Sequence, residues 1–119
     1  FPGFRQDVRE MLAQLDVYLL PSRREAGGTS VLEAMAMARP VVASDVGGLA
    51  ESLTPETGIS IPARDAQALA AATRALLEDP ERAARLGRAA RQRAVSLYSN
   101  QALIERTLAL YEHTLEGAP

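Results

Sequence analysis

Two carboxylates and a pair of adjacent glycines are the residues of this chain whose types and spacing best suit ligand chemistry. Glu25 lies shortly before Gly27 and Gly28, and Glu33 follows Glu25 after seven intervening residues. Glycines have no Cβ, so the backbone can turn sharply and a ligand can come close to its N–H groups. Loops hold a disproportionate share of binding residues. The stretch therefore predicts a binding site with a glycine turn at its centre.

A helix is expected to begin directly after the glycines. Residues 30–33 fit a capping box, in which Ser30 and Glu33 each bond the main-chain N–H of the other, and Thr29 is the alternative cap. Unpaired N–H groups at a helix N-terminus favour an anion such as phosphate. The capping box alone explains Glu33, whereas Glu25 has no local helix to serve. From the residues alone, Glu25 is the better candidate for a ligand contact.

Two short apolar runs flank this stretch and must position it. Residues 16–20 form one run, which Pro21 ends, and residues 40–44 repeat the pattern, so each predicts a buried strand. Strand, loop, helix and strand in this order make a βαβ unit, and such units place their ligands at the carboxyl ends of the parallel strands. The loop over residues 21–29 therefore lies where chemistry is expected.

The residue order in this region resembles the donor-binding half of retaining glycosyltransferases of the GT-B fold, family 4 (glycosyl transferases group 1). The resemblance rests on Pro21-Ser22, Glu25, Glu33-Ala34-Met35-Ala36 and residues 40–51. Residues 1–4 and 57–62 are similar to flanking segments of the family, so the likeness covers most of the chain. The departures are Gly27 for a frequent aromatic residue, Thr29 for an aliphatic one, and Arg39 for the usual glycine before the proline.

The resemblance implies a role for each candidate residue. Glu25, the candidate catalytic residue, contacts hydroxyls of the transferred sugar and is not a covalent nucleophile. Glu33 accepts hydrogen bonds from the ribose of the nucleotide, and main-chain N–H groups of the loop meet the donor sugar and diphosphate. The residues expected to bind substrate are Glu33, Gly27, Gly28, Thr29 and Ser30.

The function that the resemblance implies is glycosyl transfer from a nucleoside diphosphate sugar to an acceptor, with the anomeric configuration retained. Backbone N–H groups, a helix N-terminus and basic side chains are expected to meet the charge of the leaving diphosphate, with no metal and no further cofactor. The acceptor is expected to be a saccharide, a lipid or a small molecule. Two alternatives stay open: a non-catalytic module for a nucleotide or sugar phosphate, and a flavodoxin-like regulatory domain with only Asp45 well placed.

Composition excludes several other classes of function. With 15 acidic and 13 basic residues and a formal charge of -2, the chain does not have the basic balance of a nucleic-acid binder. It has no cysteine and a single histidine, His113, which rules out thiolate and multi-histidine metal sites within it. No apolar run approaches the roughly 18 residues of a membrane span. We expect a cytoplasmic protein, or one peripheral to a membrane at full length.

The remaining elements complete the predicted fold. An amphipathic helix is expected over residues 5–15 and a short peripheral strand over residues 57–62. Gly47 and Gly48 either approach a ligand or only make the turn into a short helix. The predicted fold class is α/β, a partial Rossmann-like parallel sheet with flanking helices, equivalent to the second half of a GT-B C-terminal domain and followed by C-terminal helices.

Three helices are expected in the last part of the chain. Their predicted caps are Asp65, Asp79 followed by Pro80, and Ser99 or Asn100. The last helix places apolar residues at near-heptad spacing, namely Ile104, Leu108, Tyr111 and Leu115. The middle helix is rich in arginine, and we expect a solvated face formed by Arg82, Arg85, Arg88, Arg91 and Arg93.

The sequence predicts one partial domain over residues 1–119, because it begins at Phe1 and shows only three short strands where the resemblance implies about six. An acceptor-binding N-terminal domain is expected to be missing. We therefore expect the isolated chain to bind donor weakly and not to turn over. An unpaired sheet edge also predicts self-association of the isolated chain.

Overall fold

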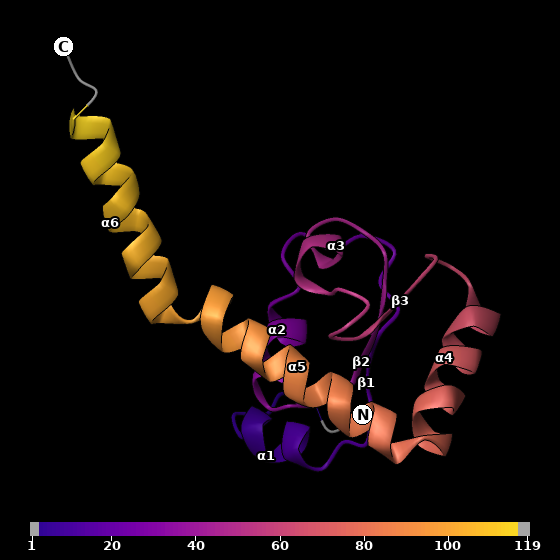
Figure 1. Ribbon diagram of the computed structural model, residues 1–119. Coiled ribbons are helices and arrows are strands. Elements are labelled where there is room, and N and C mark those ends of the chain that lie inside the picture. Colours follow the sequence, from indigo (N-terminus) through magenta and orange to yellow (C-terminus); the bar gives the residue numbers. More distant parts are fainter. Residues whose placement is uncertain (1–2, 117–119) are drawn as a thin grey trace.

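A three-stranded parallel sheet forms the centre of the computed structural model, which describes residues 3–116. The strands are β1 (Tyr18–Leu20), β2 (Val41–Ser44) and β3 (Ile59–Ile61), and they lie in the order β1-β2-β3 (Figure 1). Tyr18 lies opposite Val41, and Val42 lies opposite Ile59. Residues 1–2, which belong to the segment 1–4 of the resemblance, lie outside the described residues.

The central strand β2 is buried along its whole length because helices cover both faces of the sheet. Val41 and Ala43 belong to the apolar cluster on one face, and Val42 belongs to the cluster on the other. A continuous apolar run is typical of a parallel strand that is covered on both sides. The predicted strands on either side of the glycines are confirmed, but the prediction of burial holds only for β2, because β1 is half-buried at Tyr18 and Leu20 and exposed at Leu19.

The helices form the two outer layers. The helices described are α1 (Val8–Ala13), α2 (Thr29–Ala36), α3 (Leu49–Ser52), α4 (Ala66–Glu78), α5 (Pro80–Tyr98) and α6 (Asn100–Glu116). The cluster on one face joins α2 to the C-terminal half of α5, through residues such as Met35 and Ala94. The cluster on the other face joins α4 to the N-terminal half of α5, through residues such as Leu76 and Leu86. The predicted α/β architecture with flanking helices is confirmed.

Side-chain caps begin the three C-terminal helices as predicted. Asp65 Oδ1 accepts a hydrogen bond from the N–H of Ala68 at 2.8 Å, and Asp79 Oδ1 accepts one from Arg82 at 2.9 Å. For the last helix, Ser99 is the cap, because its Oγ accepts from the N–H of Ala102 at 3.2 Å. Caps of this kind satisfy donors that the helix itself leaves unpaired.

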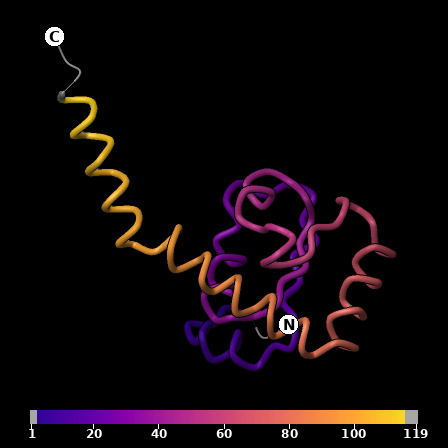
Figure 2. Tube along the Cα trace, in the orientation of Figure 1, coloured from indigo at the N-terminus to yellow at the C-terminus, as the bar shows by residue number. Residues whose placement is uncertain are grey.

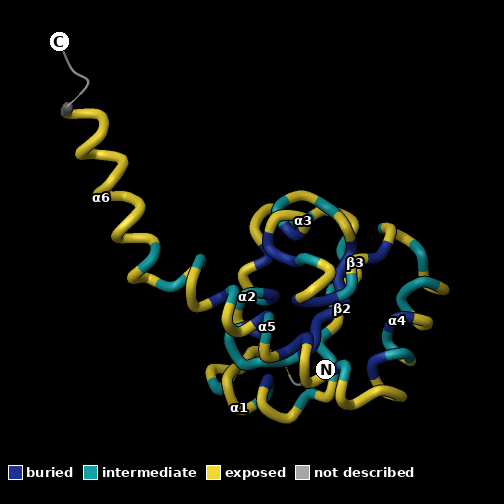
Figure 3. The backbone as a smooth tube through the Cα atoms, viewed as in Figure 1, coloured by how far each residue is buried: buried dark blue, intermediate teal, exposed yellow. Residues whose placement is uncertain are grey.

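The last helix, α6, extends away from the rest of the chain and ends far from the sheet (Figure 2). It is exposed along nearly all of its length (Figure 3), and the predicted apolar residues are at least half exposed, from Ile104 at 53% to Leu115 at 75%. Its projection contributes to a long dimension of 58 Å against 31 and 29 Å. Within residues 3–116, no helix combines the length and apolar character that crossing a membrane requires.

Candidate functional site

The loop that follows β1 and the start of α2 form the predicted site. We call residues 21–28 the glycine loop. Gly28 has a left-handed conformation (φ 61°) and is the residue from which α2 begins, since its carbonyl accepts hydrogen bonds from the N–H groups of Val31 and Leu32 at 2.8 and 3.2 Å. Only glycine adopts this conformation at little cost. The backbone of Gly28 therefore sets the start of the helix.

The predicted capping box is wrong. No side chain caps the residue at the start of α2, and Ser30 lies within the first turn of the helix. The reason is that Gly28 starts the helix before Ser30, so the hydroxyl is past the position from which it could cap. Glu33 is consequently an exposed carboxylate on the second turn, with no capping bond to the helix.

Glu25 has the local structural role that the sequence pattern assigned to Glu33. Its Oε1 accepts a hydrogen bond from the N–H of Gly28 at 3.2 Å, and the side chain is half-buried. The carboxylate thus closes the glycine loop and lies at the N-terminal end of α2, where a negative charge is favourable. A hydrogen bond at the start of α2 therefore accounts for Glu25 and not for Glu33. The second carboxylate oxygen of Glu25 accepts no hydrogen bond within residues 3–116.

Free donors and cations lie on the same loop. Within the described chain, the N–H groups of Thr29 and Ser30 have no hydrogen-bond acceptor. Arg23 and Arg24 are exposed, and neither forms an ion pair with a carboxylate of residues 3–116. These two arginines were missing from the predicted site, although their position directly before Glu25 was a visible signal. The loop therefore presents hydrogen-bond donors and positive charge at the carboxyl end of β1.

The turn at Gly47 and Gly48 lies directly under the glycine loop. A Cβ on Gly48 would lie 2.6 Å from the carbonyl oxygen of Ala26, and one on Gly47 (φ 53°) would overlap the carbonyl of Glu25. A Cβ on Gly27 would meet nothing within 4 Å. Of the two roles left open for Gly47 and Gly48, this packing favours the turn, whereas Gly27 offers open space beside the backbone of the glycine loop.

An open groove of about 1170 Å³ surrounds Glu33 between α1, α2 and α5. It is lined by Asp7, which directly precedes α1, by Arg9 of α1 and by Arg91 of α5. The Arg5 guanidinium, which is hydrogen-bonded to Asp7, lowers the pKa of that carboxyl from its ordinary value, so Asp7 is ionised at neutral pH. Glu25 does not line this groove, so the structure does not bring the two glutamates onto one concave surface.

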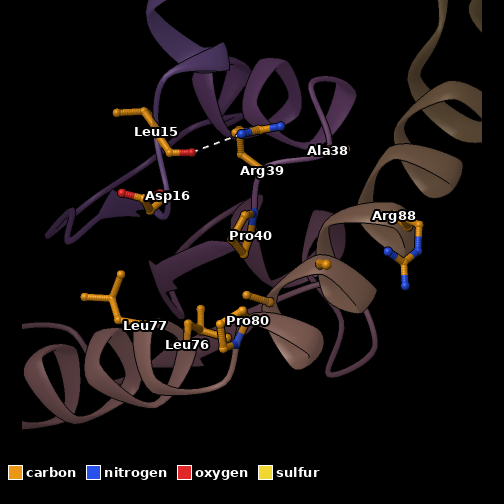
Figure 4. Close-up of a pocket in the computed structure, with 11 residues that line it drawn as sticks. Leu15, Asp16, Ala38, Arg39, Pro40, Leu76, Leu77, Pro80 and Arg88 are labelled. Atoms are coloured by element: carbon orange, nitrogen blue, oxygen red, sulfur yellow. Dashed lines mark hydrogen bonds between the residues drawn. The ribbon is translucent and has the colours of Figure 1, made fainter.

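A second hollow lies at the other edge of the sheet (Figure 4). It measures about 500 Å³ and is lined by Asp16 before β1, Pro40 before β2, and Leu76 and Pro80 on the opposite wall. The Arg39 guanidinium is occupied there, because it donates to the carbonyl of Leu15 at 3.1 Å. Ligands of open α/β sheets bind at the carboxyl ends of strands. This hollow at the amino ends is therefore not the predicted site.

One polar group at the carboxyl edge is buried without a partner. Ser44, the last residue of β2, is 2% exposed, and its Oγ has no hydrogen-bond partner within the described residues. It lines a small cavity of about 170 Å³ together with Pro21, Pro62 and Asp65. A buried hydroxyl normally finds a partner. The hydroxyl adds an available donor and acceptor to the edge where the glycine loop lies.

The arginines of α5 do not form one solvated face. Arg85 and Arg88 are exposed as predicted. Arg91 donates to the carbonyl of Ala36 at 2.5 Å, and Arg93 donates to the carbonyls of Ser52 and Glu51 at 3.0 and 2.8 Å. The prediction is wrong for Arg93, which is half-buried, whereas Arg91 stays exposed as predicted. Both side chains reach the C-terminal carbonyls of a neighbouring helix, where a cation is favourable.

Comparison with known proteins decides the family. The model of the family described as "Glycosyl transferases group 1" matches residues 1–93. The chain belongs to the glycosyl transferases group 1. A relative of this group 1 chain, the glycogen synthase of Mycobacterium tuberculosis, is 43% identical over 109 residues, which are 88% of this chain and 26% of that protein. The predicted family is confirmed.

Solved structures share the fold of this group 1 chain. The sucrose-phosphate synthase of Thermosynechococcus elongatus superposes with a TM-score of 0.82 at 37% identity, over 91% of this chain and 27% of that one. Anabaena Alr3699/HepE in complex with UDP-glucose superposes with a TM-score of 0.83 at 28% identity, over 92% and 32%. The neighbours are GT-B glycosyltransferases, so the predicted fold class is confirmed. The chain spans about a third or less of each of these proteins.

Proposed function

We propose that the full-length protein transfers a sugar from a nucleoside diphosphate sugar to an acceptor with retention of the anomeric configuration, and that this chain supplies much of the donor site. The observation that carries the proposal is the glycine loop, which leads into α2 at the carboxyl edge of the sheet with unpaired N–H groups at Thr29 and Ser30. The family supports it, as does a structural neighbour that was solved with UDP-glucose.

The diphosphate lies at the start of α2 in this proposal. The N–H groups of Thr29 and Ser30 donate to phosphate oxygens, and the positive end of the helix dipole adds about 0.3–1 kcal/mol, or about 2 kcal/mol in a partly buried site. Single preorganised donors in active sites change rates by roughly a hundredfold or more. The helix end alone is therefore too weak to stabilise the leaving diphosphate. Basic groups share in neutralising its negative charge, Arg23 and Arg24 on the loop and others outside this chain.

The nucleoside lies towards Glu33, whose carboxylate accepts hydrogen bonds from the ribose hydroxyls. Two observations support this assignment. Glu33 is exposed on the second turn of α2 and lines the open groove beside α1, and it makes no capping bond that would explain a carboxylate there. A hydrogen bond to a charged group is typically worth about 1.5–3 kcal/mol. Glu33 thus has both the space and the free acceptors that a ribose requires.

The transferred sugar lies beside Glu25 and the open face of Gly27. The free carboxylate oxygen of Glu25 accepts from a sugar hydroxyl, while the other oxygen stays bonded to Gly28. In the reaction, the bond between the anomeric carbon and the diphosphate oxygen breaks, and its electron pair leaves with the diphosphate. The acceptor oxygen bonds to the same face of that carbon, and its proton passes to the leaving diphosphate. A carboxylate nearby favours the positive charge that develops on the sugar, and no metal or further cofactor takes part.

The test is titration of UDP-, GDP-, ADP- and dTDP-sugars into the full-length protein, with Glu25→Gln and Glu33→Gln alongside. Glu33→Gln should weaken nucleotide binding by about tenfold to a hundredfold, the loss of a charged acceptor. Glu25→Gln keeps an oxygen for the N–H of Gly28, so it should weaken the sugar nucleotide more than the nucleotide alone. Normal affinities in both variants would overturn the assigned roles.

The configuration of the product separates the proposal from its alternatives. Proton NMR of the product of the full-length protein should show the same anomeric configuration as the donor sugar, and an inverted product would overturn retention. Binding without any turnover across a broad acceptor set would favour the alternative, a non-catalytic nucleotide or sugar-phosphate module.

The isolated chain should bind donor weakly and not turn over, because the helix end and the loop lack the further basic groups described above. Self-association is also expected, since the outer edge of β1 has no partner strand among residues 3–116, and an unpaired edge promotes pairing between chains. Sedimentation of the 119-residue chain measures this. A stable monomer at high concentration would contradict it.

A further inference from the structure

The support of the glycine loop depends on α3, a helix of only four residues from Leu49 to Ser52. Within it, the N–H and Oγ of Ser52 donate to the carbonyl of Gly48 at 3.3 and 3.2 Å. A single turn of helix is not stable by itself, because few hydrogen bonds offset the ordering of its backbone. Contacts from elsewhere in the fold must therefore hold α3 in one orientation.

Arg93 of α5 supplies the contacts at the C-terminal end of α3. Its Nε donates to the carbonyl of Ser52 at 3.0 Å, and its Nη2 donates to the carbonyl of Glu51 at 2.8 Å. The hydroxyl of Tyr98 also reaches the Glu51 carbonyl, at 3.4 Å. Ser52 is buried and Arg93 half-buried, so water competes only partly for these bonds. A guanidinium opposite the last carbonyls of a helix also complements its dipole.

The N-terminal end of α3 is in contact with the glycine loop. Leu49 is 1% exposed, and its side chain lies where a Cβ of Gly28 would stand. Gly48, one residue earlier, brings its backbone close against Ala26 and Gly27. Because the contact of Gly48 is made by main-chain atoms, no flexible side chain can take up a displacement at that point. A shift of α3 must therefore move the glycine loop.

We propose that Arg93 is a positioning residue for the sugar and diphosphate end of the donor. Arg93 holds α3 and the turn at Gly47 and Gly48, and these in turn hold the glycine loop. The inference rests on the proposed function above. The nucleoside end depends less on this path, since Glu33 lies further along α2, beyond the residue from which the helix begins, and α2 is held by the fully buried residues Val31 and Met35. Loss of Arg93 should therefore affect the two ends of the donor differently.

Arg39 provides a matched control at the opposite edge of the sheet. Its guanidinium also donates to main-chain carbonyls, those of Ala13 and Leu15 at 3.3 and 3.1 Å, and it is likewise half-buried. It holds the end of α1 and does not contact α3 or the glycine loop. Arg93→Ala and Arg39→Ala therefore remove the same kind of contact, and only the first lies on the proposed path.

The experiment uses the full-length protein and measures two affinities for each variant. The sugar nucleotide is whichever of UDP-glucose, GDP-mannose, ADP-glucose and dTDP-glucose the unmodified protein binds, and the reference is the matching nucleoside monophosphate. In Arg93→Ala, the sugar nucleotide should bind about tenfold more weakly and the monophosphate within about twofold of normal, as expected for a lost charged hydrogen bond at one end. Arg93→Lys should recover part of the loss, and Arg39→Ala should leave the ratio unchanged.

Hydrogen exchange gives a second readout that needs no ligand. The N–H of Gly28 and those of α3 should exchange faster in Arg93→Ala than in the unmodified protein or Arg39→Ala, because local opening becomes easier. If Arg93→Ala does not fold, Arg93→Lys is measured in both assays and should show smaller shifts in the same direction.

The two proposals fail in different ways. If the unmodified protein binds none of the sugar nucleotides, the proposed function is overturned, and exchange still tests the link from Arg93 to the loop. If the unmodified protein binds one normally, but Arg93→Ala changes neither the affinity ratio nor the exchange of Gly28, only the positioning role of Arg93 is overturned.

Discussion

The two edges of the sheet differ more in their free polar groups than in their shape. The amino edge has a hollow of about 500 Å³ lined by both apolar and charged residues, and the Arg39 guanidinium there is occupied by main-chain carbonyls. The carboxyl edge presents unpaired N–H groups at Thr29 and Ser30 and two exposed arginines without an ion pair, within residues 3–116. The comparison teaches that unsatisfied hydrogen-bonding capacity, rather than concavity, distinguishes the edge that carries the candidate site.

The edges also differ in how their backbones are held. At the amino edge, a side chain makes the contact: Arg39, between α2 and β2, donates to the main-chain carbonyls of Ala13 and Leu15 at the end of α1. At the carboxyl edge, main chain meets main chain, because Gly47 and Gly48 allow the turn to touch the glycine loop. A contact without side chains leaves less tolerance for substitution, so the two edges should respond differently to added methyl groups.

The largest effect is expected for Gly47→Ala at the carboxyl edge. The left-handed backbone costs about 1–2 kcal/mol with a Cβ, and the overlap with the Glu25 carbonyl adds about 1–3 kcal/mol. Sugar nucleotide binding should be lost, and the melting temperature of the full-length protein should fall. Gly27→Ala is the matched control for stability and should leave the melting temperature unchanged, since a Cβ at Gly27 meets no protein atom within 4 Å. Normal binding by Gly47→Ala would remove the difference between the edges.

Gly87→Ala tests the amino edge with a similar insertion. A Cβ at this position of α5 would overlap the carbonyl of Ala38, so we expect a loss of stability of about 1–3 kcal/mol. Below the melting temperature, the affinity for sugar nucleotide should stay within about twofold of normal, because the overlap is remote from the glycine loop. Calorimetry and titration of the same sample measure both. A large loss of affinity would show that the edges are coupled.

Ala38→Gly should stabilise the protein by about 1 kcal/mol and leave donor affinity unchanged. Ala38 has a positive φ of 55° just after α2, a conformation that costs about 1–2 kcal/mol for a residue with a Cβ. Ala70→Gly, on the exposed middle turns of α4, is the control and should destabilise by about 0.5–1 kcal/mol. A decrease in melting temperature for Ala38→Gly would contradict the expectation.

The smallest effect is expected from the loop cations. Arg23→Ala and Arg24→Ala together should weaken sugar nucleotide binding by only a few fold, because exposed charge pairs are worth about 0.2–1 kcal/mol each. The dependence of affinity on salt should become shallower, since fewer cations face the diphosphate. Titration at two salt concentrations measures this, with Arg85→Ala as an exposed control on α5. An unchanged salt dependence would place these arginines outside the donor site.

The sequence was sufficient where the signals are local. Asp65 and Asp79 bond the N–H groups three residues later, and the apolar runs before Pro21 and after Arg39 form strands, because these patterns need only neighbours in the chain. The family resemblance added the order of strand, glycine loop and helix. The location of the candidate site at the carboxyl end of β1 followed from that order.

The sequence was insufficient where contacts are distant or where two local patterns compete. Residues 30–33 fit a capping box, but the left-handed Gly28 starts the helix earlier and donates its N–H to Glu25 Oε1. Arg91 bonds a residue 55 positions away, and Arg93 bonds residues 41 and 42 positions away. A helical wheel of α5 alone does not contain these distant partners, so it assigns both arginines to a solvated face. The position that favours glycine after α2 is Ala38, with its positive φ, whereas the resemblance had placed it at Arg39.

The main-chain contact beneath the glycine loop fixes the course of its backbone independently of the side chains that the loop exposes. Since Gly47 and Gly48 touch the carbonyl groups of Glu25 and Ala26, the outward side chains at positions 23 and 24 can change without altering the course of the backbone. The charge that the loop presents can therefore differ through substitutions at these two exposed positions while its main chain stays in place.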